Sequence, residues 1–163
     1  MIFTPLSIAT PAYYNKYNPY TPVALPTTPV QSIAPTAPTF GPGTVAFKGG
    51  RSGKYCADDP NNMVCNRDAI GPWEKFIVSD LGNGVYSLTS GRTNQLCSDN
   101  SSYGVCNRGA LGPWEKFIIQ NVGPNTVTIR GGNQGKYCTD DNNGFTCNRD
   151  AVGPWETFTW QFV

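Results

Sequence analysis

A segment of twelve residues occurs three times in the C-terminal part of the chain, at a constant spacing of 41 residues. Its copies run from Cys65 to Phe76, from Cys106 to Phe117 and from Cys147 to Phe158. A fixed period of this size is typical of proteins built from one repeated unit that cannot bury its apolar face alone. The chain is therefore expected to hold three structural repeats, at about 44–84, 85–125 and 126–163.

Each repeat contains four short segments with strand-like composition, separated by turn-forming clusters of Gly, Asn and Asp. In the first repeat these segments are Val45–Lys48, Lys54–Ala57, Met63–Asn66 and Lys75–Val78. Three such units are too few for a propeller, which typically has at least about four blades. Short strands without helices instead fit a closed barrel with threefold symmetry that is capped by hairpins. The sequence therefore predicts an all-β fold, a β-trefoil, over residues 44–163.

The recurring motifs also resemble a known family. The repeats carry Gly-Lys-Tyr or a variant of it, an acidic turn, Asn-Arg and then Gly-Pro-Trp-Glu. This order is similar to the repeat of fascin-like β-trefoil domains, and the similarity covers residues 44–163. The resemblance implies the trefoil fold, although the cysteines stand where that family is expected to have small or aliphatic core residues. Animal fascins bundle actin with several trefoils in one chain, and the single trefoil here departs from that arrangement.

Residues 1–43 differ in composition from the repeats. They hold nine of the fourteen prolines, and their only charged residue is Lys16. Frequent proline prevents a helix and removes strand donors, so we expect an extended arm with no regular secondary structure. The arm is either a linker or a segment that binds a protein partner. Its apolar composition favours partner binding, because solvating linkers are usually rich in Gly, Ser or charge. The candidate contacts are Tyr13, Tyr14, Tyr17 and Tyr20.

The six cysteines form three pairs whose partners are nine positions apart: Cys56 and Cys65, Cys97 and Cys106, and Cys138 and Cys147. The repeat favours disulfides within each unit, because each bridge would then join the two strands of one hairpin. Reduced core thiols are an alternative. A zinc site is disfavoured, since the spacing is unlike that of zinc ligands and the chain has no histidine.

Two further sets of side chains occur once per repeat. The aromatic set is expected to fill the core, because large aromatic side chains dominate protein interiors. Its members are Trp73, Trp114, Trp155, Phe76, Phe117 and Phe158. In the charged set an arginine precedes a glutamate by seven residues, which predicts the ion pairs Arg67 with Glu74, Arg108 with Glu115 and Arg149 with Glu156. Occurrence in every repeat favours a structural role for both sets.

The hairpin tips are rich in Asp and Asn, in segments that begin at Asp58, Asp99 and Asp140. Such residues suit tight turns, and clustered carboxylates could also bind calcium. No glutamate stands at the distance that a calcium-binding loop requires, so turn formation is the preferred interpretation. Tyr103 and Phe145 lie in two of these tips and are candidates for stacking against a glycan.

Composition excludes several classes of function. A net charge of +1 with 14% charged residues provides no basic surface for nucleic acid or for an anionic membrane. No apolar segment is long enough to span a bilayer, and the N-terminus is a poor secretory signal. The sequence has no histidine, no lone cysteine and no glycine-rich phosphate loop. We therefore expect neither an enzyme nor a bound cofactor or metal.

Three hypotheses for the function remain. The first is a minor capsid or cement protein of a large virus particle, whose arm tethers a trefoil knob to neighbouring subunits of the virion. We prefer it on architecture, because an apolar arm orders only when a partner supplies the missing surface. The second is an extracellular carbohydrate-binding module, since many trefoils are lectins. The third is a fascin-like cytoskeletal cross-linker, which the resemblance alone implies.

Overall fold

The computed structural model describes residues 13–14, 22–23, 37–100 and 102–163. The chain divides into two units, Met1–Thr36 and Ala37–Val163. In the first unit, β1 (Tyr13–Tyr14) pairs antiparallel with β2 (Pro22–Val23), with Tyr13 opposite Val23. This adds one short strand pair to an arm that the sequence predicts to be irregular. Tyr17 and Tyr20 lie outside the described residues.

The second unit repeats one pattern of four strands and a short 3-10 turn. The first copy consists of β3 (Gly43–Gly49), β4 (Tyr55–Asp58), β5 (Met63–Arg67), η1 (Pro72–Glu74) and β6 (Phe76–Gly82). The second consists of β7 (Val85–Ser90), β8 (Leu96–Asn100), β9 (Tyr103–Arg108), η2 (Pro113–Glu115) and β10 (Phe117–Gly123). The third consists of β11 (Thr126–Gly131), β12 (Tyr137–Asp141), β13 (Gly144–Arg149), η3 (Pro154–Glu156) and β14 (Thr157–Phe162). No helix in the described part of the chain is long and apolar enough to cross a membrane.

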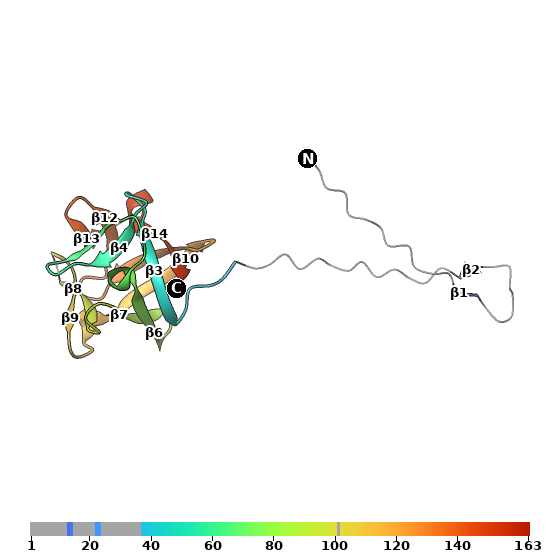
Figure 1. Ribbon diagram of the computed structural model, residues 1–163, viewed down its shortest axis with the longest axis horizontal. Coiled ribbons are helices and arrows are strands. Elements are labelled where there is room, and N and C mark those ends of the chain that lie inside the picture. Colours follow the sequence, from blue (N-terminus) through green and yellow to red (C-terminus); the bar gives the residue numbers. More distant parts are fainter. Residues whose placement is uncertain (1–12, 15–21, 24–36, 101) are drawn as a thin grey trace. The chain divides into compact units, whose positions relative to one another are not determined.

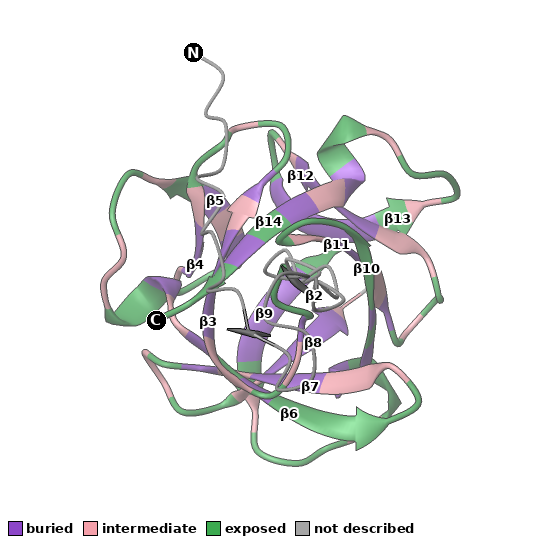
Figure 2. Ribbon diagram, turned by 90° about the vertical axis from the view of Figure 1, so that its right-hand side faces the viewer, coloured by how far each residue is buried: buried purple, intermediate pink, exposed green. Residues whose placement is uncertain are grey.

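Six of these strands close into a barrel. Going round it, β3 pairs with β6, β6 with β7, β7 with β10, β10 with β11, β11 with β14, and β14 with β3. All of these pairs are antiparallel. Each repeat adds one hairpin to the ring, namely β4–β5, β8–β9 and β12–β13. The fold is therefore the β-trefoil that the sequence predicts (Figure 1). Figure 2 turns the ring of strands towards the viewer and shows its buried residues in purple.

The core lies inside the barrel and under the hairpins. Along β6 the side chains alternate, so Phe76 and Val78 are buried while Ile77 faces outward. Phe76 and its counterparts Phe117 and Phe158 are fully buried, each at 0% exposure. Phe76 and Phe117 are the first residues, and Phe158 the second residue, of the strand that leaves the 3-10 turn, which is why the same ring recurs at the same place in each repeat.

The three predicted disulfides are confirmed. They join Cys56 to Cys65, Cys97 to Cys106 and Cys138 to Cys147, and in each case the two cysteines stand opposite each other in one hairpin. All six cysteines are buried. Each bridge closes a short loop and should contribute roughly 2–3 kcal/mol to the free energy of unfolding in the chain-entropy model.

Phe40, just before the first barrel strand, packs into the core of the second unit. Its ring lies 5.1 Å from that of Trp160, 5.2 Å from that of Tyr86 and 5.8 Å from that of Phe47. Its backbone N–H donates to Asn121 Oδ1 at 3.1 Å. Only 5% of the residue is exposed. The compact unit thus includes residues before position 44, where the sequence analysis places its start.

Candidate functional site

The indoles that the sequence analysis assigns to the core are instead at the surface. Trp73, Trp114 and Trp155 are 39%, 43% and 43% exposed, respectively. The local backbone explains the difference. In η1 the proline at the first position starts a tight 3-10 turn, and Glu74 rather than Trp73 turns inward, with 6% exposure. The core assignment was wrong for all three indoles because residue type does not reveal which way a short turn points its side chains.

The buried glutamate holds this turn together. Glu74 Oε2 accepts a hydrogen bond from the backbone N–H of Gly71 at 2.6 Å. Glu115 and Glu156 accept the equivalent bonds from Gly112 and Gly153 at 2.7 and 2.8 Å. Each turn therefore presents its indole on a backbone fixed by a charge-assisted hydrogen bond.

An arginine of the same repeat lies beside each glutamate. The predicted partners Arg67 and Glu74, Arg108 and Glu115, and Arg149 and Glu156 are 3.6 Å apart in every repeat, measured from arginine Nε to glutamate Oε1. Two of these arginines also approach an indole. The guanidinium carbon of Arg67 is 5.8 Å from the ring centroid of Trp73, and that of Arg108 is 5.9 Å from Trp114. These distances are those of cation–π contacts.

A second arginine reaches the indole from the following repeat. Arg92 lies 5.4 Å from the Trp73 ring, and Arg51 lies 6.0 Å from the Trp155 ring. In the third repeat, which follows the repeat of Trp114, Asn133 stands at the position equivalent to Arg51 and Arg92. We call these three junctions the indole sites: site 1 around Trp73, site 2 around Trp114 and site 3 around Trp155. Each one is built from two successive repeats.

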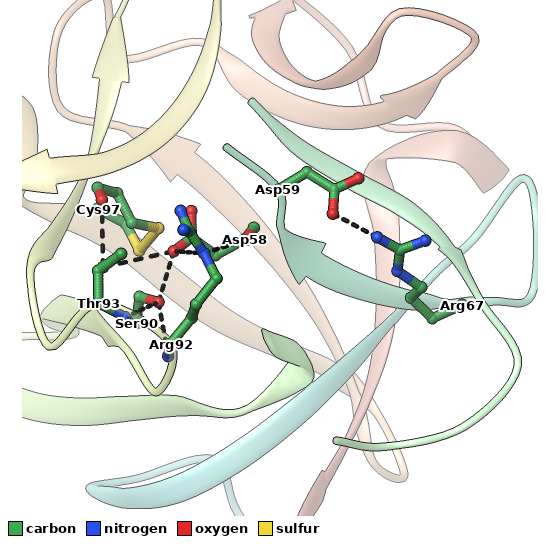
Figure 3. A network of polar contacts seen from close by, with 8 residues as sticks. Asp58, Asp59, Arg67, Ser90, Arg92, Thr93 and Cys97 are labelled. Carbon is green, nitrogen blue, oxygen red and sulfur yellow. Dashed lines mark hydrogen bonds and ion pairs between the residues drawn. A yellow bond between two sulfur atoms is a disulfide. The ribbon is translucent and has the colours of Figure 1, made fainter. Parts of the chain in front are cut away.

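Buried aspartates anchor the second arginine. Asp58 Oδ2 accepts hydrogen bonds from Ser90 Oγ at 2.6 Å and from Arg92 Nε at 3.1 Å, and the Asp58 carbonyl oxygen accepts from the same Nε at 2.7 Å (Figure 3). At site 3, the Asp140 carboxylate accepts a hydrogen bond from the backbone N–H of Ser52 at 2.8 Å and pairs with Arg51. Both aspartates are at most 1% exposed.

Sequence reasoning missed the role of these aspartates, which it assigned to turn tips. The sequence feature that could have revealed this role is the constant spacing between each aspartate and a small residue of the next repeat. A Cβ at Gly49 would overlap the carboxylate of Asp140, and a Cβ at Gly131 would overlap that of Asp99. At the remaining junction the small residue is Ser90, which donates to Asp58 instead.

Asp99 belongs to the one junction without a second arginine. Its carboxylate accepts a hydrogen bond from the backbone N–H of Asn133 at 3.3 Å, and the residue is 1% exposed. Burial raises the pKa of the Asp99 carboxyl above its usual value, and hydrogen bonds from the backbone of Asn133 and Gln134 offset part of this rise. Site 2 is therefore electrostatically different from the other two.

The two glycan candidates in the hairpin tips have different surroundings. Tyr103 is 38% exposed, as its position in a tip suggests. Phe145 is only 2% exposed, which excludes it as a surface contact. Its ring lies 5.5 Å from that of Phe158 and occupies the space over Gly104, its counterpart one repeat earlier. Neighbouring residues of a strand point to opposite faces. Tyr103 therefore faces away from the side on which Gly104 meets Phe145.

Among the described residues, no group of three or more His, Cys, Asp or Glu side chains is arranged to hold a metal ion. The carboxylates of the indole sites are engaged by arginines and backbone N–H groups instead. The chemistry that these sites offer is therefore a half-exposed aromatic face with hydrogen-bond donors and acceptors beside it.

Comparison with known proteins identifies the fold. No protein-family description and no curated protein sequence matches the chain. Among solved structures, the designed threefold symmetric protein ThreeFoil has a TM-score of 0.67 at 12% identity, covering 74% of this chain and 99% of ThreeFoil. SeviL bound to asialo-GM1 saccharide has a TM-score of 0.64 at 7% identity, with coverages of 76% and 99%. The BEL beta-trefoil has a TM-score of 0.63 at 12% identity, with coverages of 79% and 98%.

Identities this low show the fold alone. The chain is a β-trefoil protein, and its likeness to these structures does not single out the fascin-like group. The sequence resemblance to that group remains a prediction.

Proposed function

We propose that the trefoil is a carbohydrate-binding module that contacts glycans through the indole sites. The observation that carries the proposal is the threefold recurrence of a half-exposed indole beside guanidinium and carboxylate groups. The C–H bonds of a pyranose ring pack well on the electron-rich face of an indole. Sugar hydroxyls then exchange hydrogen bonds with the fixed charged groups at its edge. A purely structural core role does not account for indoles that are exposed in all three repeats.

Other observations support a binding role. SeviL, which shares the fold, was solved with a saccharide, although its low identity transfers no residue role to this chain. Three buried disulfides favour an oxidising compartment, and an extracellular location agrees with glycan recognition. Nothing in the indole sites resembles a catalytic arrangement, so the proposed role is binding without chemistry.

The assembly hypothesis concerns a different part of the chain. A role of residues 1–43 in tethering the protein to capsid subunits, through Tyr13, Tyr14, Tyr17 and Tyr20, stays a prediction, as does location in a virion. A cross-linking role similar to that of fascins also stays a prediction. Tethering by the arm does not conflict with glycan binding by the trefoil, because Met1–Thr36 and Ala37–Val163 are separate units.

A glycan array probed with the full chain tests the proposal. We expect the wild-type protein to bind a defined set of glycans, and the triple variant Trp73→Ala, Trp114→Ala, Trp155→Ala to bind them at least tenfold more weakly. Ile118→Ala is the matched control, because Ile118 is a 39% exposed apolar residue outside the indole sites. Circular dichroism shows whether each variant is folded.

Tyr103→Ala separates the two candidate surfaces. Retained binding in this variant, with loss in the triple variant, assigns glycan contact to the indole sites. Loss in Tyr103→Ala with full binding by the triple variant would move the site to the hairpin tip. Absence of any bound glycan in the wild-type protein would refute the proposed function.

A further inference from the structure

The arginines of the indole sites already have anionic partners inside the protein. Arg92 binds the buried Asp58 through two contacts to one Nε, at 2.7 and 3.1 Å. Arg67 donates a hydrogen bond to Asp59 (Figure 3) and also pairs with Glu74. In site 3, Arg149 lies between Asp141 at 3.7 Å and Glu156 at 3.6 Å.

Releasing such an arginine to a ligand would leave a carboxylate uncompensated inside the protein. Asp58 and Asp140 are 0% and 1% exposed, and one oxygen of each carboxylate already has no hydrogen-bond partner among the described atoms. Removing one member of a buried ion pair is strongly destabilising, because the remaining charge has lost both water and its partner. The guanidinium groups of Arg92 and Arg51 are therefore not available as counter-ions for an anionic ligand.

The charge balance of each site is negative. Around each indole, the carboxylates of the contacting groups outnumber the guanidinium groups by one. Site 1 has Arg67 and Arg92 against Asp58, Asp59 and Glu74. Site 3 has Arg51 and Arg149 against Asp140, Asp141 and Glu156. Site 2 has Arg108 against Asp99 and Glu115.

We infer, on the basis of the proposed function, that the indole sites select neutral glycans and reject sialylated, sulfated and other anionic ones. Stacking on the indole requires no charge on the sugar. In sites 1 and 3 the partly exposed carboxylates of Asp59 and Asp141, at 21% and 13%, can accept hydrogen bonds from sugar hydroxyls, whereas a ligand carboxylate or sulfate would face them at close range. Like charges in a partly desolvated site repel more strongly than in water, and salt screens them less than fully exposed charges.

The test compares matched pairs of oligosaccharides on one array, each neutral glycan beside its sialylated and its sulfated counterpart. We expect the wild-type full chain to bind the anionic member of each pair at least tenfold more weakly at low salt. The difference should narrow as the salt concentration rises, because screening reduces the repulsion.

A charge variant tests the cause. Asp59→Asn with Asp141→Asn removes one carboxylate from site 1 and one from site 3, and repeat 2 already has Asn100 at this position. We expect several-fold weaker discrimination against anionic glycans. Asp80→Asn is the control, because the carboxylate of Asp80 accepts a hydrogen bond from Gly82 rather than from an indole-site arginine.

The outcomes are distinguishable. Equal or stronger binding of anionic glycans that is lost in the triple tryptophan variant would overturn this inference and keep the proposed function. Unchanged discrimination in the Asp59→Asn, Asp141→Asn variant would also overturn it. Failure of every glycan to bind, or binding that the triple variant retains, would instead refute the proposed function itself.

Discussion

At the scale of single residues, tryptophan is buried at one position of this fold and exposed at three others. Trp160, on β14, is 3% exposed and lies between Phe40 and Phe162, with ring centroids 5.1 and 5.0 Å away. The other three tryptophans follow a proline in a 3-10 turn and are exposed. The alternation of side chains along β14 explains why Trp160 is buried, and the geometry of the 3-10 turns explains why the other three are exposed. Hydrophobicity, which is the same for all four, explains neither.

Asp99 gives a prediction at this scale. Because its pKa is raised in the folded state, the folded chain binds more protons than the unfolded chain, and stability falls as the pH rises through the raised pKa. Asn133→Arg supplies the guanidinium that the other two junctions have as Arg51 and Arg92. We expect this substitution to lower the pKa of Asp99 and to raise the free energy of unfolding at pH 7 by about 1.5 kcal/mol.

Urea unfolding between pH 3.5 and pH 7 checks this prediction, with the range set by the model-peptide value of about 3.9 for aspartate. The loss of stability on raising the pH should be smaller in Asn133→Arg than in the wild-type protein. Asp99→Asn, which cannot ionise, should show a similarly weak pH dependence. Parallel pH profiles for all three proteins would contradict the assignment of this charge effect to Asp99.

At the scale of elements, each 3-10 turn packs against a glycine of the next repeat. The N–H of Gly91 donates to the carbonyl oxygen of Lys75 at 2.8 Å, just after η1. A Cβ at Gly132 would overlap the carbonyl oxygens of Pro113 and Lys116, and one at Gly50 would overlap those of Pro154 and Thr157. The repeats are thus joined by backbone contacts at the same junctions that carry the indole sites.

Gly132→Ala should therefore destabilise the fold by about 2–3 kcal/mol, because two backbone carbonyl groups would have to move. Gly109→Ala is the matched control: a Cβ there meets nothing within 4 Å, and the other repeats have Asp68 and Asp150 at this position. Thermal unfolding followed by circular dichroism measures both. Equal melting temperatures for the two variants would contradict the close junction.

The repeat period made most elements predictable from the sequence. The expected strand Lys54–Ala57 is observed as β4, one residue later at each end, and the disulfides follow from the same period. The parts that could not be predicted depend on contacts between repeats and on the geometry of short turns. The burial of Asp58 arises where one repeat meets the next, and a periodic sequence does not state which neighbour each residue faces. The exposure of Trp73 depends on the direction in which a short 3-10 turn points its side chains, which residue type does not reveal.

At the scale of the whole molecule, Phe40 marks where the trefoil begins. It is buried among Phe47, Tyr86 and Trp160, although it precedes the first barrel strand. We expect a chain truncated to residues 37–163 to be as stable as the full chain. Truncation to residues 44–163 should cost about 3 kcal/mol, the usual effect of removing a buried phenylalanine ring.

Phe40→Ala in the full chain is the control for this comparison, since it removes the ring and keeps the backbone. Its free energy of unfolding should fall by a similar amount to that of the 44–163 chain. Equal stability of the 37–163 and 44–163 chains in urea would show that Phe40 is not part of the core.

The central claim is that three of the four indoles bind glycan, and nuclear magnetic resonance tests it most directly. A ¹H–¹⁵N spectrum of the full chain should show four indole N–H signals, one per tryptophan, assigned by single Trp→Phe variants. On titration with a neutral oligosaccharide that the array identifies, the signals of Trp73, Trp114 and Trp155 should shift. The signal of the buried Trp160 should stay in place. Saturation by that oligosaccharide without a shift of any exposed indole would contradict the account.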